Sequence, residues 1–256
     1  MSTDLSDSIS RIQSLSLESA HHGIPFLDEL FSRHPELEML TPVHYERQSI
    51  ARRIFRTGNR RHNVGLFASR LNQAMVPFES NLEKHACALF ESRSEILDYR
   101  SQPMAIQLFF LGQFREVYPD FILTTARRSV LVDVKFSEQA RRSKFLARAE
   151  ALQHYARQRG MGYTVLTESE IRVPRMESAA WLISLARGIP SPQLTEQVWA
   201  WLKTMADQTL SEVITKTQMY PQVQCTLAAL ILDGHLEFDW DRDLKPQPLR
   251  LQVAST

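Results

Sequence analysis

The chain has 256 residues, of which 43% are hydrophobic and 23% charged, and its formal net charge is +1 at pH 7. This composition is typical of a soluble globular protein and excludes a chain that is disordered throughout. Cys87 and Cys225 lie far apart without a CxxC pair, so neither a disulfide framework nor a zinc ribbon is indicated. The first residues are serine-rich and acidic, and no segment has the apolar length of a membrane span. We therefore expect a cytoplasmic protein without membrane contact.

Charge divides the first 70 residues. Residues 1–45 form an acidic leader with a short helix expected around Phe26–Phe31. A basic segment follows over residues 46–70, and from Arg47 to Arg70 it carries seven arginines and no acidic residue. Closely spaced guanidinium groups release counterions from a nucleic-acid backbone, so the segment indicates DNA binding; a solvated loop or a surface for an acidic partner is the alternative. The candidate DNA-binding residues are Arg52, Arg53, Arg56, Arg60, Arg61 and Arg70.

Residues 71–170 show the pattern of a compact α/β core. The stretch FESNLEKHACALFE, which starts at Phe78, predicts a helix with Ser80 as its N-cap. Three strand-like runs follow, MAIQLFFL, VYPDFILTT and VLVDVKF, and the last two are separated by ARRS, which is interpreted as a hairpin turn. A long helix is expected from about Glu138 to Gln158, ended by Gly160, and YTVLT predicts one more strand.

Two charges, Asp133 and Lys135, interrupt the apolar strand VLVDVKF. Successive side chains on a strand point to opposite faces, so these two emerge on the same face. The hairpin places Asp120 opposite a residue between them. Paired carboxylates suit a hard divalent cation such as Mg2+, and a neighbouring lysine can offset charge that develops on a phosphate. The alternative is an Asp-Lys pair on a solvated edge strand, although charges inside a Val/Leu run are costly without a partner or an ion.

A further carboxylate candidate, Glu83, lies near the start of the first predicted helix. Glu83 also follows Ser80 at the spacing of a capping box, in which the glutamate bonds to the N-cap amide. The spacing does not separate a metal-binding role from a capping role. Glu79, one residue before the cap, is a competing choice.

The order Pro119-Asp120, a hydrophobic strand, then Asp133-Val134-Lys135 resembles the PD-(D/E)xK signature of restriction-endonuclease-like nucleases. Its surroundings are VGLFASRLNQAMVPFESNLEKHACALFE, YRSQPMAI, YPDF, VDVK and TVLTESEI. With these blocks the chain is similar to TnsA, the endonuclease subunit of a heteromeric transposase of bacterial cut-and-paste transposons. The likeness covers roughly residues 50–171 and implies an α/β restriction-endonuclease-like nuclease domain over residues 1–170, with its catalytic core over residues 71–170.

The resemblance also implies the site residues, position by position. It assigns catalytic roles to Glu83, Asp120, Asp133 and Lys135, and it favours Glu83 over Glu79. Asp120 and Asp133 would hold Mg2+, which Mn2+ can replace, Glu83 would position a second ion or its water, and Lys135 would stabilise charge during hydrolysis. The acidic place of the D/E-x-K motif, here Asp133, is not uniform in the family. Weaker candidates are Gln102, which could instead bond a neighbouring strand, and Glu150, whose alternative is a solvated helix face.

Residues 171–256 predict a mainly α, winged-helix-like C-terminal domain. Helices are expected on both sides of a turn, followed by Gly234 and a short strand from Leu236 to Trp240. Few basic residues and the acidic end EFDWDRD favour protein contact over DNA contact. In TnsA-like proteins this region contacts an AAA+ ATPase regulator. The chain lacks a GxxxxGK[ST] motif, so ATP hydrolysis is expected from that partner.

Taken as a whole, the resemblance implies a metal-dependent endonuclease that acts on double-stranded DNA in the bacterial cytoplasm. It would cut the non-transferred strand at the 5′ ends of the transposon, while an integrase-type transposase cuts and joins the 3′ ends. One alternative is a standalone PD-(D/E)xK restriction or repair nuclease. Another is a catalytically inactive winged-helix DNA-binding adaptor, against which the intact Asp120, Asp133 and Lys135 argue.

Overall fold

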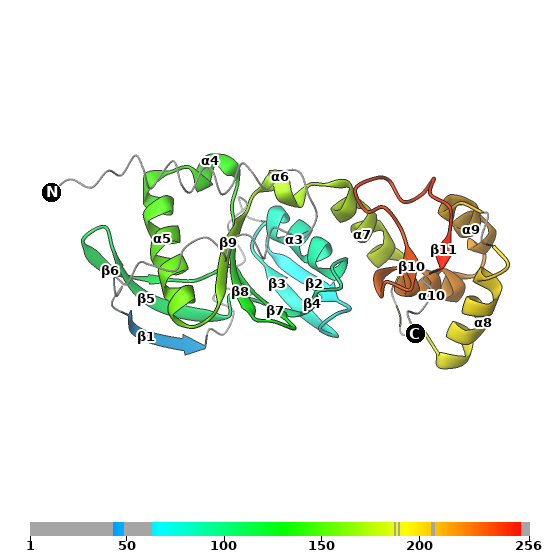
Figure 1. The fold of residues 1–256 in the computed structure, drawn as a ribbon, viewed down its shortest axis with the longest axis horizontal. Helices are drawn as coiled ribbons and strands as arrows, with labels where there is room; N and C mark the ends of the chain where they lie inside the picture. Colours follow the sequence, from blue (N-terminus) through cyan, green and yellow to red (C-terminus); the bar gives the residue numbers. More distant parts are fainter. Residues whose placement is uncertain (1–42, 49–62, 187, 189, 206–207, 252–256) are drawn as a thin grey trace. The chain divides into compact units, whose positions relative to one another are not determined.

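The computed structural model describes residues 43–48, 63–186, 188, 190–205 and 208–251 (Figure 1). The chain divides into two compact units, the first made of residues 1–56 and 100–170 and the second of residues 57–99 and 171–256. The domain boundary expected after residue 170 stays a prediction, and residues 57–99 group with the C-terminal part. The helix expected around Phe26–Phe31 lies outside the described residues.

Two sheets form the framework of the nuclease-like core. In the antiparallel three-stranded sheet, the order is β1 (Val43–Gln48), β5 (Met104–Phe110) and β6 (Gln113–Val117). The four-stranded sheet has the order β4 (Ile96–Ser101), β7 (Phe121–Thr125), β8 (Ser129–Val134) and β9 (Gly162–Leu166). β7 and β8 are antiparallel, whereas β8 and β9 are parallel. The parallel pair is connected through helices, which is the crossover that parallel strands require.

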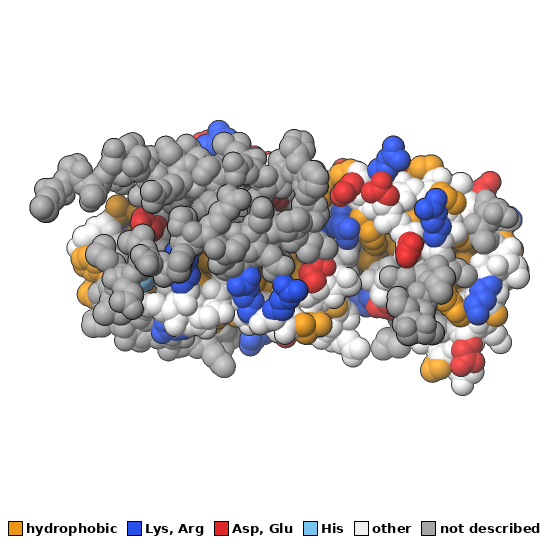
Figure 2. Space-filling view, viewed as in Figure 1, with side chains coloured by type: hydrophobic (Ala, Val, Ile, Leu, Met, Phe, Trp, Pro, Cys, Tyr) orange, Lys and Arg blue, Asp and Glu red, His pale blue; other side chains and the backbone are white. Residues whose placement is uncertain are grey.

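The strand predicted over VYPDFILTT is β7 over its last five residues only. Val117 ends β6 and Phe121 begins β7, and β6 pairs with β5 through a two-residue turn, Leu111-Gly112. Both turn residues have positive φ, 50° and 75°, as a type I′ turn requires. Such turns favour Asn-Gly, so Leu-Gly carries no hairpin signal and β6 is not predicted. Figure 2 shows hydrophobic side chains on the surface where this hairpin ends, and Phe109, Leu111 and Phe114 are exposed there.

The single helix predicted over residues 138–158 is wrong, because the segment forms α4 (Ser137–Ala140) and α5 (Ser143–Gln158). Arg142, at the break, has an extended backbone. The Ser137 N–H and hydroxyl both donate to the Glu168 carboxylate, at 2.7 and 2.6 Å, and so fix α4 from the start of α6 (Glu168–Ile171). This anchor lies far along the chain, so local periodicity does not reveal it. Gly160, with φ of 66°, follows the end of α5 as expected.

Helix α5 covers one face of the strands of the first unit (Figure 1). Leu152 and Tyr155 of α5 are fully buried in a cluster that also contains Leu108 of β5, Leu131 of β8 and Tyr163 of β9. One face of β8 therefore points at α5. Because strand side chains alternate, Asp133, two positions after Leu131, lies on this same covered face.

The second unit joins a hairpin to a set of helices. β2 (Gly65–Ser69) and β3 (Ala74–Phe78) are antiparallel, and α3 (Asn81–Glu91) follows them with Ser80 as its N-cap, as predicted. Helix α3 packs against α7 (Pro174–Leu185). This packing between distant segments explains why residues 57–99 belong with the C-terminal part of the chain.

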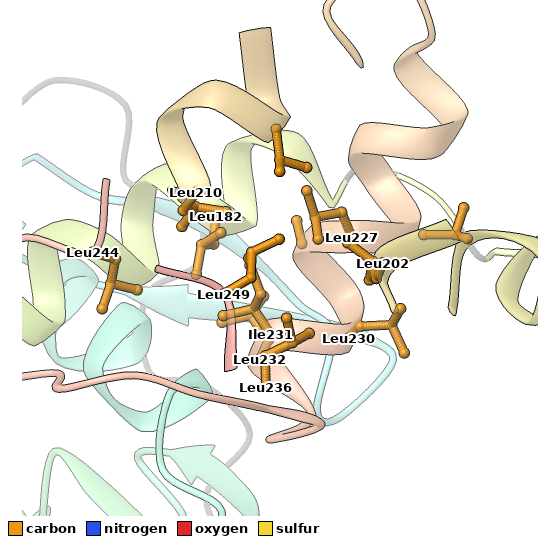
Figure 3. Close-up of a cluster of buried hydrophobic side chains, with 13 residues drawn as sticks. Leu182, Leu202, Leu210, Leu227, Leu230, Ile231, Leu232, Leu236, Leu244 and Leu249 are labelled. Carbon is orange, nitrogen blue, oxygen red and sulfur yellow. The ribbon is translucent and has the colours of Figure 1, made fainter. Parts of the chain in front are cut away.

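The C-terminal helices enclose a leucine-rich core, in which Leu202, Leu210 and Leu227 are fully buried (Figure 3). Its elements are α8 (Pro192–Leu202), α9 (Leu210–Thr217), α10 (Pro221–Leu232), β10 (Leu236–Glu237) and β11 (Arg250–Leu251). The strand expected from Leu236 to Trp240 is limited to its first two residues, and the winged helix stays a prediction. None of the helices in the described part of the chain has the length and apolar character needed to cross a membrane.

Candidate active site

Asp120 and Lys135 meet at the end of the β7–β8 hairpin. The register pairs Phe121 with Val132, so Asp120 continues it opposite Asp133, within the span that the sequence indicates. The Lys135 ammonium donates a hydrogen bond of 2.6 Å to Asp120 Oδ2. The Val134 N–H donates to the same oxygen at 2.7 Å. The carboxylate is thereby held by both the main chain and a side chain of the Asp133-Val134-Lys135 segment.

The backbone at Asp120 is held from a second side by Gln102. The Gln102 N–H donates to the Asp120 carbonyl at 2.8 Å. Gln102 itself has a φ of 42°, a left-handed conformation that is uncommon and costly for a residue other than glycine. The sequence identifies Gln102 as a weaker site candidate, and the structure places its main chain directly against Asp120.

Burial and the neighbouring charges together set the protonation of Asp120 and Lys135. Burial raises the pKa of Asp120 above its usual range; Lys135 opposes this rise and Asp133 adds to it. Burial alone would lower the pKa of Lys135, but the Asp120 and Asp133 carboxylates outweigh it and raise the pKa above the ordinary value. Lys135 is therefore an ammonium ion at neutral pH.

Asp133 is fully buried, and both of its carboxylate oxygens are occupied. Arg148 Nη1 donates to Oδ2, and Nη2 donates to Oδ1 at 3.1 Å, in a bidentate ion pair. The Tyr163 hydroxyl donates to Oδ2 at 2.7 Å. To bind a metal ion, Asp133 would have to exchange these donors for it. The structure brings Asp133 beside Asp120 and Lys135 but directs its carboxylate to α5.

Sequence reasoning does not single out Arg148 or Tyr163. A signal is nevertheless present, because Arg148 lies among Phe145, Ala149 and Leu152, whose spacing in the sequence forms one apolar helix face. A charge on a buried face is costly unless it is paired, so its position indicates a buried carboxylate partner. The partner is Asp133, 15 residues earlier.

The segment that carries this site matches a known protein family. Residues 93–168 match the family of the TnsA-like endonuclease N-terminal domain, and they include Asp120, Asp133, Lys135 and the whole of α5. This segment is similar to the N-terminal domain of TnsA-like endonucleases. No curated protein matches the chain. The match confirms the resemblance stated from the sequence motifs and indicates a nuclease domain over these residues.

The TnsA-like domain contains donors that suit the divalent metals of such nucleases. Within the described residues, both side-chain hydrogen bonds of Asp120 fall on Oδ2, which leaves Oδ1 directed to no protein donor. Carboxylate oxygens are the ligands that hard divalent cations prefer. The described residues contain no group of three or more His, Cys, Asp or Glu side chains arranged to hold a metal ion. The Asp120 carboxylate is therefore suited to bind a metal ion, but the described side chains as they stand do not form a complete metal site with it.

Glu83 starts α3 in the second unit, outside the segment matched by the TnsA-like family. The Ser80 hydroxyl oxygen accepts from the Glu83 N–H at 3.1 Å, and its hydroxyl donates to Glu83 Oε1 at 3.0 Å. Glu83 Oε2 accepts from the Glu79 N–H at 2.8 Å. The capping role that the spacing allows is thus present, with the bonded amide one residue earlier than expected. A metal-binding role for Glu83 stays a prediction.

The remaining candidates fall outside this cluster. Glu150 is exposed on α5, in agreement with the alternative of a solvated helix face. Arg70 forms an ion pair with Asp233 at 2.7 Å in the second unit. The other candidate DNA-binding residues lie outside the described residues, namely Arg52, Arg53, Arg56, Arg60 and Arg61.

Proposed function

We propose that this protein is the Mg2+-dependent DNA endonuclease subunit of a cut-and-paste transposase. It cleaves the non-transferred strand at the 5′ ends of the transposon, and an integrase-type transposase cuts and joins the 3′ ends. One observation carries the proposal: Lys135 and Asp120 are in direct contact at the end of the motif strand, inside a segment that matches TnsA-like endonucleases.

The proposed metal ligands are Asp120, Asp133 and Glu83, together with the Val134 carbonyl. Asp120 Oδ1 supports this assignment most directly, whereas Asp133 joins only if Arg148 releases it. When bound, a divalent ion supplies a water of lowered pKa and neutralises charge on the phosphate, and Mn2+ serves in place of Mg2+.

Lys135 has two roles in this proposal. Its hydrogen bond to Asp120 Oδ2 holds the carboxylate in place. Its ammonium also offers a fixed positive charge where negative charge develops on the scissile phosphate. The Gln102 main chain supports both roles because it holds the Asp120 carbonyl from a neighbouring loop.

DNA and protein partners complete the proposal. The arginines of the basic segment, from Arg52 to Arg61, bind phosphates that flank the cleavage position. The C-terminal helices contact an AAA+ ATPase regulator. Met219 and Tyr220, 79% and 62% exposed between α9 and α10, are apolar side chains suited to such a contact. The protein acts on double-stranded DNA at the transposon ends in the bacterial cytoplasm.

The test is strand-specific cleavage of labelled transposon-end DNA with the cognate transposase, the regulator and Mg2+. We expect Asp120→Ala and Lys135→Ala to abolish 5′-end cleavage while the partner still nicks the 3′ ends. Lys144→Ala, which removes an exposed lysine of α5, is the matched control and should cut normally. If 5′ cleavage survives both site substitutions, the proposal fails. Cleavage by the lone chain at unrelated DNA would instead favour a standalone nuclease.

A further inference from the structure

Arg148 joins three parts of the first unit. From α5 it reaches the Asp133 carboxylate on β8 with both terminal nitrogens, and Nη2 also donates to the Tyr118 carbonyl at 2.8 Å. Tyr118 lies two residues before Asp120, in the turn that leads into β7. One guanidinium group therefore connects the motif strand, the turn that carries Asp120 and the covering helix.

The cost of this arrangement indicates a role beyond filling the core. The Arg148 side chain is 18% exposed and the Asp133 side chain 0%. A buried ion pair is often no more stable than apolar residues of the same volume, because both ions lose their hydration. The surrounding face of α5, with Leu152 and Tyr155, is apolar and would accept such residues. The ion pair is nevertheless present, and Tyr163 adds another donor to the same carboxylate.

Charge balance shows what the pair does at the site. Lys135 neutralises Asp120, and Arg148 neutralises Asp133. Without Arg148, a second buried carboxylate without its guanidinium partner would lie beside Asp120 and would attract a divalent ion to the face of β8 that points at α5. With Arg148 in place, Asp120 Oδ1 is the oxygen of the two carboxylates that accepts no hydrogen bond within the described residues.

We propose that Arg148 is a positioning residue of this site: it occupies the Asp133 carboxylate and holds the Tyr118 carbonyl, so that a divalent ion binds at Asp120. This inference rests on the proposed nuclease function for its catalytic consequence. It has a separate consequence for metal binding, since removal of the guanidinium frees a carboxylate that attracts cations. A residue that acted only by filling the core would not increase metal affinity when it is removed.

The test is Mn2+ titration of the full-length chain, with free Mn2+ followed by electron paramagnetic resonance, combined with the reconstituted cleavage assay. We expect Arg148→Met to bind Mn2+ roughly tenfold more tightly than wild type, because a net positive charge is lost beside the site. Its kcat should fall by about 10- to 100-fold with KM for DNA unchanged, the usual size of an effect on groups that orient metal ligands. Arg148→Lys keeps the charge and should bind Mn2+ as wild type does, with a reduced kcat.

Two variants keep the test decisive. Arg157→Met removes an exposed arginine of the same helix and should match wild type in both assays. Arg148→Met combined with Asp133→Asn removes the freed carboxylate together with its partner, so Mn2+ affinity should return to the wild-type value while kcat stays low. This pair of changes leaves no uncompensated buried charge, and it carries the test if Arg148→Met alone does not fold.

The outcomes separate the two proposals. A folded Arg148→Met chain that binds Mn2+ no more tightly than wild type would overturn the positioning role. Full kcat in the double variant would overturn it too. A wild-type chain that cuts no DNA, with the expected Mn2+ affinities across the variants, would overturn the nuclease function and still support the positioning role.

Discussion

Lys135 Nζ lies 2.6 Å from Asp120 Oδ2 across the end of the β7–β8 hairpin, although the two residues are 15 positions apart in the sequence. The same carboxylate oxygen accepts the Val134 N–H at 2.7 Å. The pair is mostly buried, with side-chain exposures of 28% for Lys135 and 17% for Asp120. Its two charges therefore depend on each other more strongly than an exposed pair would.

Removal of the lysine alone should destabilise the fold. Lys135→Met leaves the buried Asp120 carboxylate without its cation, so we expect unfolding free energy to fall by about 1 to 3 kcal/mol in urea denaturation. Asp120→Asn in the Lys135→Met background should recover part of the loss, because the uncompensated charge is gone. Lys144→Met is the exposed control and should stay within about 0.5 kcal/mol of wild type. Equal losses in the single and double variants would show that the two charges are not coupled.

The contact between Asp120 and Lys135 is accessible to sequence reasoning because it depends on short-range regularities. Strand alternation puts Asp133 and Lys135 on one face, and a hairpin between two apolar runs brings Asp120 opposite them. The partner of Asp133 depends instead on how α5 crosses the sheet. Arg148 is visible in the sequence only as a charge on an apolar helix face. Pattern alone shows that it needs a partner and does not show which one.

Other differences between the sequence prediction and the structure also arise from contacts between distant parts of the chain. The break between α4 and α5 contains no proline or glycine, and Ser137 is fixed by Glu168, 31 residues later. Residues 57–99 group with the C-terminal part because α3 packs on α7. Local propensity carries no information on either contact. The α/β order of the core was accessible because buried strands and an amphipathic helix have distinct periods.

Glu91 of α3 is a buried carboxylate that joins the β2–β3 turn to β4. It is 2% exposed and accepts from the Ser69 hydroxyl at 2.6 Å, the Tyr99 hydroxyl at 2.8 Å and the Leu71 N–H at 3.0 Å. Glu91→Gln replaces an acceptor with an NH2 donor that faces these donors. We expect a loss of about 2 to 4 kcal/mol in unfolding free energy, measured by urea denaturation.

The matched control for this change is Glu95→Gln. Glu95 faces Arg93 at 3.6 Å, with both side chains partly exposed, so its substitution should cost less than about 1 kcal/mol. Similar losses in the Gln variants of Glu91 and Glu95 would mean that the buried carboxylate does not hold the turn.

Helix α9 has a capping box that makes its stability depend on pH. Glu212 Oε2 accepts from the Thr209 N–H at 2.8 Å and from its hydroxyl at 2.9 Å. These two hydrogen bonds lower the pKa of Glu212 below its ordinary value of 4.5, and the bond from the Thr209 N–H has the larger effect. A lowered carboxyl pKa contributes stability above pH 4.5 that is lost as the pH falls through the lowered value.

We therefore expect Glu212→Gln to lower the melting temperature at pH 7, and the difference from wild type to shrink as the pH falls below 4.5. Thermal unfolding followed by circular dichroism from pH 7 to pH 3 checks this, with Glu196→Gln on α8 as an exposed control without such a cap. A difference that stays constant over this pH range would assign the effect to helix propensity rather than to the ionised cap.

The β5–β6 hairpin offers a substitution that should stabilise the protein. Leu111 has a φ of 50° and is 53% exposed, so it bears the cost of a left-handed backbone with little burial in return. Asparagine tolerates this conformation and, before Gly112, completes the favoured sequence of a type I′ turn. Leu111→Asn should raise the unfolding free energy by about 1 kcal/mol in urea denaturation. Leu97→Asn is the control, because Leu97 is 55% exposed in β4 and is not among the described residues of positive φ. Asparagine is a poor strand former, so the control should lose stability. If both substitutions destabilise the chain equally, the positive φ of Leu111 does not lower the unfolding free energy of the wild-type protein.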